Sequence, residues 1–232
     1  RSRGLGDVYK RQVLITLQDE AKKKTPKILT PKETILEQKR EVSLKEEKDN
    51  NRYYVYVKGE VVLTTDSVSD AIIAANSQMG VVIGENQQYV WKRSRKTAQA
   101  AFNDIVVGEE DSGAGSIAQC VNAILEKEEI NISVSALISQ GETPKQILLN
   151  TLKDATVLDL TGCTVDEILY YVSNGYPVFA MTGSSDAVLV VGYDANNVVL
   201  YDPAMGQTYK RTTADADEMF FNAGNIFFTY QK

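Results

Sequence analysis

The chain has 232 residues, 43% of them hydrophobic and 24% charged, which is the composition of an ordinary globular protein with no apolar run long enough to cross a membrane. It contains no histidine, and this excludes Ser-His-Asp and Cys-His catalytic sites as well as histidine-bound zinc. Residues 98–232 hold 18 acidic side chains against 6 basic ones, an excess that disfavours nucleic acid as a partner and favours neutral or basic ligands.

The first 51 residues are predicted to carry little of the fold. Residues 1–12 resemble the translation of a sequencing-library adapter, so we expect them to be an artefact and the chain to be a fragment of a larger bacterial polypeptide whose remainder lies N-terminal. Residues 13–51 are rich in Lys, Glu and Gln and are interrupted by Pro26 and Pro31, which is typical of a charged linker. One helix is expected there, around residues 32–48.

A small α+β module is predicted over residues 52–96. Ser67 is placed to cap its helix, and Gly80 to end that helix in a left-handed conformation. The aromatic residues Tyr89 and Trp91 are interpreted as packing residues rather than ligand contacts. The expected order is strand, strand, helix, strand, strand, at residues 53–57, 61–64, 68–79, 81–83 and 88–91.

A larger domain is predicted over residues 97–232, with most helices first and an antiparallel sheet second. Thr143 is a helix N-cap followed by Pro144, and Thr164 forms a capping box with Glu167. Helices are expected at residues 116–125, 134–139, 144–152, 165–173 and 214–221, and strands at residues 157–160, 177–181, 187–193, 198–201, 207–210 and 225–230. This order predicts an α+β fold in which the helices are segregated from the sheet.

Four segments of this domain carry a resemblance to a known family. They are Ser116-Ile-Ala-Gln-Cys-Val-Asn-Ala-Ile-Leu125, Asn174-Gly-Tyr-Pro-Val-Phe-Ala180, Asp186-Ala-Val-Leu-Val-Val-Gly-Tyr-Asp194 and Tyr201-Asp-Pro-Ala-Met-Gly206. Over about residues 110–232 the sequence resembles the papain-like bacteriocin-processing peptidases that act on double-glycine leaders, cysteine peptidase family 39. In that family one strand opens with the catalytic histidine and ends in Val-Gly-Tyr-Asp, and an Asp-Pro turn supplies the orienting aspartate. The resemblance implies a papain-like fold, with a helical half packed on an antiparallel sheet.

The same resemblance implies where a catalytic site would lie. Asp186 falls in the slot of the histidine and Ser116 in the slot of the cysteine. Glu110 takes the slot of the oxyanion glutamine, and Asp202 is retained as the orienting aspartate. These replacements indicate a degenerate site, because a carboxylate is a poor base for serine and an ionised Glu110 would repel a developing oxyanion.

The two cysteines, Cys120 and Cys163, are interpreted as small buried hydrophobic residues. Their number and spacing fit neither a disulfide framework nor a metal site, although one bridge between them stays open. Cys120 lies one helical turn beyond Ser116, so it lacks the terminal amides that lower a thiol pKa and has no histidine partner. Cys163 is spaced from Ile168 as a hydrophobic staple.

Two functions follow as hypotheses. The first is a catalytically inactive papain-like domain that binds extended or basic peptides near Ser116, Asp186 and Asp202, or that serves as a structural module of a larger bacterial protein. The second is a hydrolase with a rearranged site, in which Ser116 or Cys120 is the nucleophile and Asp186 or Asp202 is the base. Neither hypothesis requires a cofactor or a metal. The compartment is not indicated by the sequence, and the resemblance is compatible with a cell-surface or secreted protein.

Overall fold

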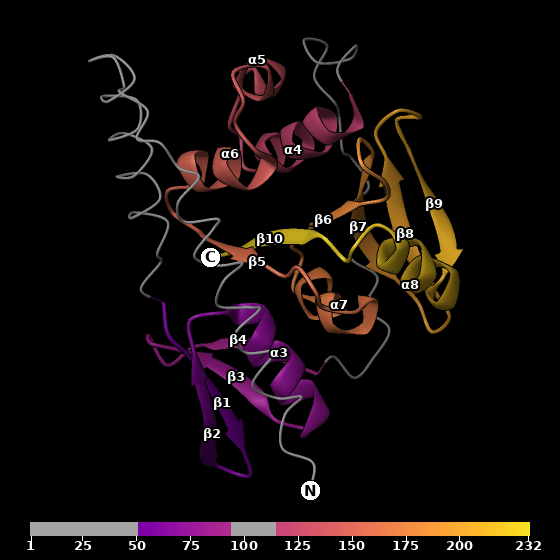
Figure 1. The fold of residues 1–232 in the computed structure, drawn as a ribbon. Coiled ribbons are helices and arrows are strands. Elements are labelled where there is room, and N and C mark those ends of the chain that lie inside the picture. Colours follow the sequence, from indigo (N-terminus) through magenta and orange to yellow (C-terminus); the bar gives the residue numbers. More distant parts are fainter. Residues whose placement is uncertain (1–50, 94–114) are drawn as a thin grey trace, which may run out of the picture. The chain divides into compact units, whose positions relative to one another are not determined.

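Two antiparallel sheets, one of four strands and one of six, organise the described part of the chain, residues 51–93 and 115–232, in this computed structural model (Figure 1). The predicted class of mixed helices and antiparallel sheet is confirmed by these pairings. The predicted adapter at residues 1–12, the linker at residues 13–51 and the boundary between residues 96 and 97 lie outside the described residues.

The smaller sheet has the strand order β2-β1-β3-β4, with one helix packed against it. Its elements are β1 (Tyr53–Val57), β2 (Glu60–Thr65), α3 (Val68–Ser77), β3 (Val81–Gly84) and β4 (Tyr89–Lys92). The helix begins as expected, because the Ser67 hydroxyl accepts a hydrogen bond from the Asp70 amide at 3.2 Å.

The end of α3 differs from the sequence prediction. Met79, not Gly80, takes the left-handed conformation, with φ at 53°. Gly80 instead lies against the neighbouring strand, where an added Cβ atom would meet the Tyr56 carbonyl oxygen at 2.6 Å. The glycine is therefore required by the close approach of β1 rather than by its own backbone angles.

The larger sheet has the strand order β5-β10-β6-β7-β8-β9. Its elements and helices are α4 (Ser116–Lys127), α5 (Val134–Ser139), α6 (Pro144–Thr151), β5 (Thr156–Asp159), α7 (Val165–Ser173), β6 (Val178–Met181), β7 (Ala187–Tyr193), β8 (Asn197–Asp202), β9 (Gln207–Thr212), α8 (Thr213–Asn222) and β10 (Phe227–Gln231). The predicted bounds of α5, α7 and β7 are confirmed residue for residue.

Helices cover both faces of the larger sheet, which differs from the expected segregation of helices from sheet. In Figure 1, α4 and α6 lie on one side of β6 and β10, and α7 lies on the other. The reason is the central strand β7, whose seven residues are all buried. Ala187 and Leu189 pack into the core under α4, whereas Val188 and Val190 pack into the core that contains α7. A strand that is apolar on both faces needs cover on both.

The two sheets contribute to one hydrophobic core, and Glu167 of α7 contacts both α3 and β4 beside it. The Trp91 indole nitrogen donates to the Glu167 carbonyl at 2.8 Å, and Trp91 is 1% exposed. The Asn76 side chain donates to Glu167 Oε1 at 3.0 Å, while Glu167 Oε2 accepts from the Thr164 amide at 2.8 Å. Glu167 thus caps its own helix and holds both α3 and β4 against it. Trp91 is a packing residue, whereas Tyr89 is half exposed.

Candidate functional site

The first helical residue of α4 meets the first residue of β7. The Ser116 hydroxyl accepts a hydrogen bond from the Ala187 amide at 3.0 Å. Gly115, the N-cap residue of α4, has no side chain with which to cap the helix. The structure therefore places Ser116 beside the residue that follows Asp186, although the two positions are 70 residues apart in the sequence.

Asp186 lies in the turn that joins β6 to β7, and its side chain is exposed. Its Oδ2 atom accepts a hydrogen bond from the Ser185 hydroxyl at 3.3 Å, and its carbonyl accepts from the Thr182 amide at 2.8 Å. The carboxylate is thus a solvated group of a turn, with a serine hydroxyl as its partner.

Asp202 is the last residue of β8, and it closes the turn that follows. Its Oδ1 atom accepts a hydrogen bond from the Ala204 amide at 2.9 Å. Because Leu189 pairs with Tyr201 in antiparallel register, the end of β8 lies beside the start of β7. Asp202 and Asp186 therefore come to the same end of the strand pair.

The three predicted site residues are neighbours, but they do not form a catalytic chain. Within the described residues, no hydrogen bond joins the side chains of Ser116, Asp186 and Asp202 to one another. Each hydroxyl or carboxylate instead has a partner in its own turn or in the backbone of β7. Glu110, assigned to the oxyanion slot, lies outside the described residues.

Cys120 faces the core on the α4 side of the sheet and is fully buried. Burial raises the pKa of its thiol far above the usual value, and the negative charge of Asp202 raises it further. The hydroxyl of the neighbouring Tyr201 is also buried and has no hydrogen-bond partner among the described residues. The surroundings of Cys120 therefore keep the thiol protonated and unreactive. Cys163 is likewise free and buried, so the two cysteines form no bridge.

In the described ranges, no three cysteine or carboxylate side chains are grouped so that they could bind a metal ion. The helices of these same ranges are all too short or too polar to cross a membrane.

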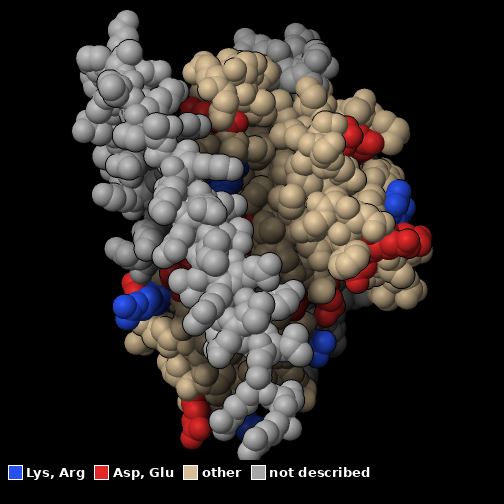
Figure 2. All heavy atoms as spheres, in the orientation of Figure 1, with Lys and Arg blue, Asp and Glu red and all other residues tan. Residues whose placement is uncertain are grey.

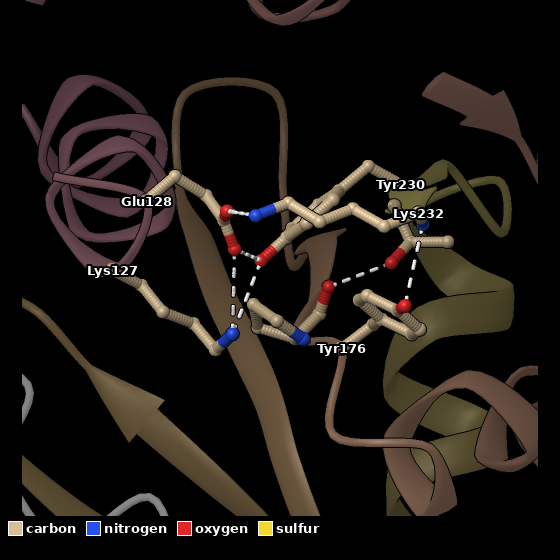
Figure 3. A network of polar contacts seen from close by, with 7 residues as sticks. Lys127, Glu128, Tyr176, Tyr230 and Lys232 are labelled. Carbon is tan, nitrogen blue, oxygen red and sulfur yellow. Dashed lines mark hydrogen bonds and ion pairs between the residues drawn. The ribbon is translucent and has the colours of Figure 1, made fainter. Parts of the chain in front are cut away.

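A second polar cluster, which sequence reasoning missed, joins the end of α4 to the end of β10 (Figure 3). The Tyr230 hydroxyl donates to Glu128, and Lys127 Nζ donates to the Tyr230 hydroxyl at 3.3 Å. Glu128 also forms ion pairs with Lys127, at 3.4 Å, and with Lys232. The Lys232 amide donates to the Tyr176 hydroxyl at 3.2 Å.

The carboxylate of Glu128 is the centre of this cluster, and its side chain is only 7% exposed. Burial alone would raise its pKa, but Lys232, Tyr230 and Lys127 together hold the pKa below its usual value. Burial and the adjacent carboxylate raise the pKa of Tyr230 well above its usual value. The cluster fastens the C-terminal strand β10 to the end of α4. No sequence motif marks it, because Glu128 and Tyr230 are about 100 residues apart.

Comparison with known proteins gives one distant structural neighbour. No family model matches the chain, and no curated protein matches it. Among solved structures, a Bacillus anthracis protein described as a C39-like peptidase is similar over 60% of this chain and 98% of its own, at 15% identity and a TM-score of 0.45. The likeness is one of fold and is distant, so it carries no argument about activity.

Proposed function

We propose that residues 115–232 form a catalytically inactive, papain-like peptidase domain that binds extended basic peptides as part of a larger bacterial protein. The observation that carries the proposal is the hydrogen bond from the Ala187 amide to Ser116 Oγ, at 3.0 Å. A nucleophilic hydroxyl must give its proton to a base and direct a lone pair at the substrate. The Ser116 hydroxyl has instead one lone pair committed to the backbone of β7, where it fastens a helix to a strand.

The absence of a base supports the same proposal. The chain has no histidine, and the two nearby carboxylates are engaged in their own turns, Asp186 with Ser185 and Asp202 with the Ala204 amide. Carboxylates ordinarily ionise at about pH 4, which makes them weak bases for a serine hydroxyl at neutral pH. The alternative nucleophile, Cys120, is fully buried.

The charge of this part of the chain supports a basic ligand. Residues 98–232 carry three acidic side chains for each basic one. In the face drawn in Figure 2, acidic side chains lie along the flank where α8 and β9 lie in Figure 1, with a few basic ones between them. Asp186 adds an exposed carboxylate at the start of β7, beside the first turn of α4. Lysine and arginine side chains of an extended peptide would pair with such carboxylates by charge-assisted hydrogen bonds.

A binding measurement tests the ligand. A lysine-rich peptide carrying a fluorophore is titrated with the full chain, and anisotropy is followed at several salt concentrations. We expect affinity to fall as salt rises, and Asp186→Asn to weaken binding by roughly 1.5- to fivefold, the value of one exposed charge pair. Asp154→Asn is the matched control, because Asp154 is an exposed acid between α6 and β5, away from both the start of β7 and α8. Equal losses in the two variants would mean that only the overall charge attracts the peptide.

A cleavage assay tests inactivity. We expect double-glycine leader peptides to remain intact after incubation with the chain. Cleavage that disappears in Ser116→Ala or in Cys120→Ala would overturn the proposal in favour of a hydrolase with a rearranged site. If the peptides are neither cleaved nor bound, the remaining hypothesis is that the domain serves as a structural module of a larger protein.

The double variant Ser116→Cys with Asp186→His tests whether positions 116 and 186 correspond to the cysteine and the histidine of the family's catalytic site. A thiol at the start of α4 with an imidazole beside it should have a lowered pKa. We expect iodoacetamide to alkylate the double variant faster at pH about 6 than the single variant Ser116→Cys, which has no such partner. Equal alkylation rates in the two variants would show that position 186 is not the vacated histidine slot.

A further inference from the structure

The edge strand β2 exposes three consecutive apolar side chains. Val61 and Val62 are each 47% exposed and Leu63 is 36% exposed. On its inner side β2 pairs with β1, and its outer side has no paired strand within the described residues. The outer backbone groups of such a strand are a template for pairing with another strand.

The other edge strands of the two sheets carry charges that discourage pairing. Lys92 ends β4, Asp159 ends β5, and β9 contains Lys210 with Arg211. The only charge in β2 is Glu60, its first residue, and it contains no proline. Charged side chains are the usual means by which edge strands avoid association, and β2 has the longest uncharged run of these four strands, five residues against three in each of the others.

The two ends of β2 carry opposite charges. Lys58 lies in the turn before the strand and Asp66 directly after it. Both are exposed, and neither forms an ion pair with another described residue. In an antiparallel pair of β2 strands from two copies, centred on Val62, the turn residue Lys58 of each copy comes to the same end of the pair as Asp66 of the other. Val61 of each copy then lies opposite Leu63 of the other, so both the charged and the apolar residues are self-complementary.

We infer that β2 is a dimerisation strand, which pairs antiparallel with β2 of a second copy of this chain and joins the two small sheets into one. The β-bulge of β2 lies at the centre of the proposed pair. Val62 is the residue without a partner in β1, since Val55 pairs with Leu63 and Tyr56 with Val61. The extra residue is thus an exposed valine at the centre of the pair, and β2 pairs regularly with β1 on both sides of it. This inference is independent of the function proposed for residues 115–232.

Sedimentation of the full chain over a range of concentrations tests the pairing. We expect a reversible dimer, and Val62→Lys should raise its dissociation constant at least tenfold, because two like charges would face each other at the centre of the pair. Ile73→Lys is the matched control, since Ile73 is a similarly exposed apolar residue, 42% accessible, but lies on α3. A monomer at all concentrations, or a dimer that Val62→Lys leaves unchanged, overturns the inference.

A charge exchange tests the register. Lys58→Glu creates two repulsive pairs in the dimer, and we expect it to weaken association roughly three- to tenfold. Adding Asp66→Lys to the same chain reverses both charges and should restore the original affinity to within about twofold. Failure of this rescue overturns the antiparallel pairing centred on Val62. Hydrogen exchange of the β2 amides distinguishes a different partner. If the chain stays monomeric and these amides become protected only when an added peptide binds, β2 pairs with a peptide and not with a second copy.

Discussion

Replacing Ser116 by alanine tests whether its hydroxyl fastens α4 to β7. The hydrogen bond from the Ala187 amide is 3.0 Å long, and Ala187 is 2% exposed. The variant would leave a buried amide without a partner, which costs about 1–3 kcal/mol. The folded-to-unfolded ratio should then fall between about 5-fold and 150-fold, with a midpoint temperature lower by roughly 2–12 °C.

Urea denaturation followed by tryptophan fluorescence measures this loss, with the slope of the transition expected to stay constant. Ser116→Thr keeps a hydroxyl acceptor and should retain most of the stability. The matched control is Ser139→Ala, because the exposed Ser139 hydroxyl only donates to the Ser135 carbonyl in its own helix, at 2.8 Å. That change should stay within about 0.5 kcal/mol. If Ser116→Ala costs no more than the control, the hydroxyl is not a structural fastener and the argument for inactivity loses its basis.

Three further predictions concern the core and the polar clusters. Cys120 and Cys163 should resist alkylation at pH about 8 until the chain unfolds, because burial raises both thiol pKa values and excludes the reagent. Mass spectrometry measures the alkylation, and modification of either cysteine in the native chain would contradict this prediction. Glu128 has a pKa lowered by folding, so its contribution to stability is complete above the unfolded pKa of about 4.3 and is lost as the pH falls through the folded pKa. Glu128→Gln should therefore make the free energy of unfolding, measured by urea denaturation, depend less on pH on the acid side. An unchanged pH dependence would mean that the cluster at Glu128 does not contribute to stability. Trp91→Phe should cost about 1–3 kcal/mol, because it removes the indole hydrogen bond to Glu167 and leaves a cavity around a buried side chain, and a smaller loss in thermal unfolding would contradict this.

Helix positions could be predicted where local chemistry decides them. Thr164 and Glu167 interact across three residues, and the capping box that they form places the start of α7 correctly. Thr143 with Pro144 does the same for α6. The strand β7 was also predicted with its observed bounds, because a run of apolar residues ends at a polar turn. These features depend on contacts between residues close in the sequence.

Long-range arrangement could not be predicted in the same way. The uninterrupted apolar run of β7 indicates a buried strand, but only the packed structure shows that α4 and α7 divide its two faces. The bond from Trp91 to Glu167 joins residues 76 positions apart, and the cluster at Glu128 joins residues about 100 apart. In the candidate site, the resemblance placed Ser116 and Asp186 in neighbouring slots. It did not indicate that the serine would accept a hydrogen bond from β7.

The hydrogen bond of Ser116 gives a structural role to the position that we propose as a lost nucleophile. An active nucleophile is kept from its neighbours so that substrate and base can reach it, and such sites commonly cost stability. At the junction of α4 and β7, Asp186 instead turns to Ser185, and the serine hydroxyl is bonded directly to the Ala187 amide. Placing a cysteine at position 116 and a histidine at position 186 should therefore change two properties in opposite directions, with thiol reactivity rising and stability falling. A double variant that gained reactivity at no cost in stability would mean that the serine had not exchanged a catalytic role for a structural one.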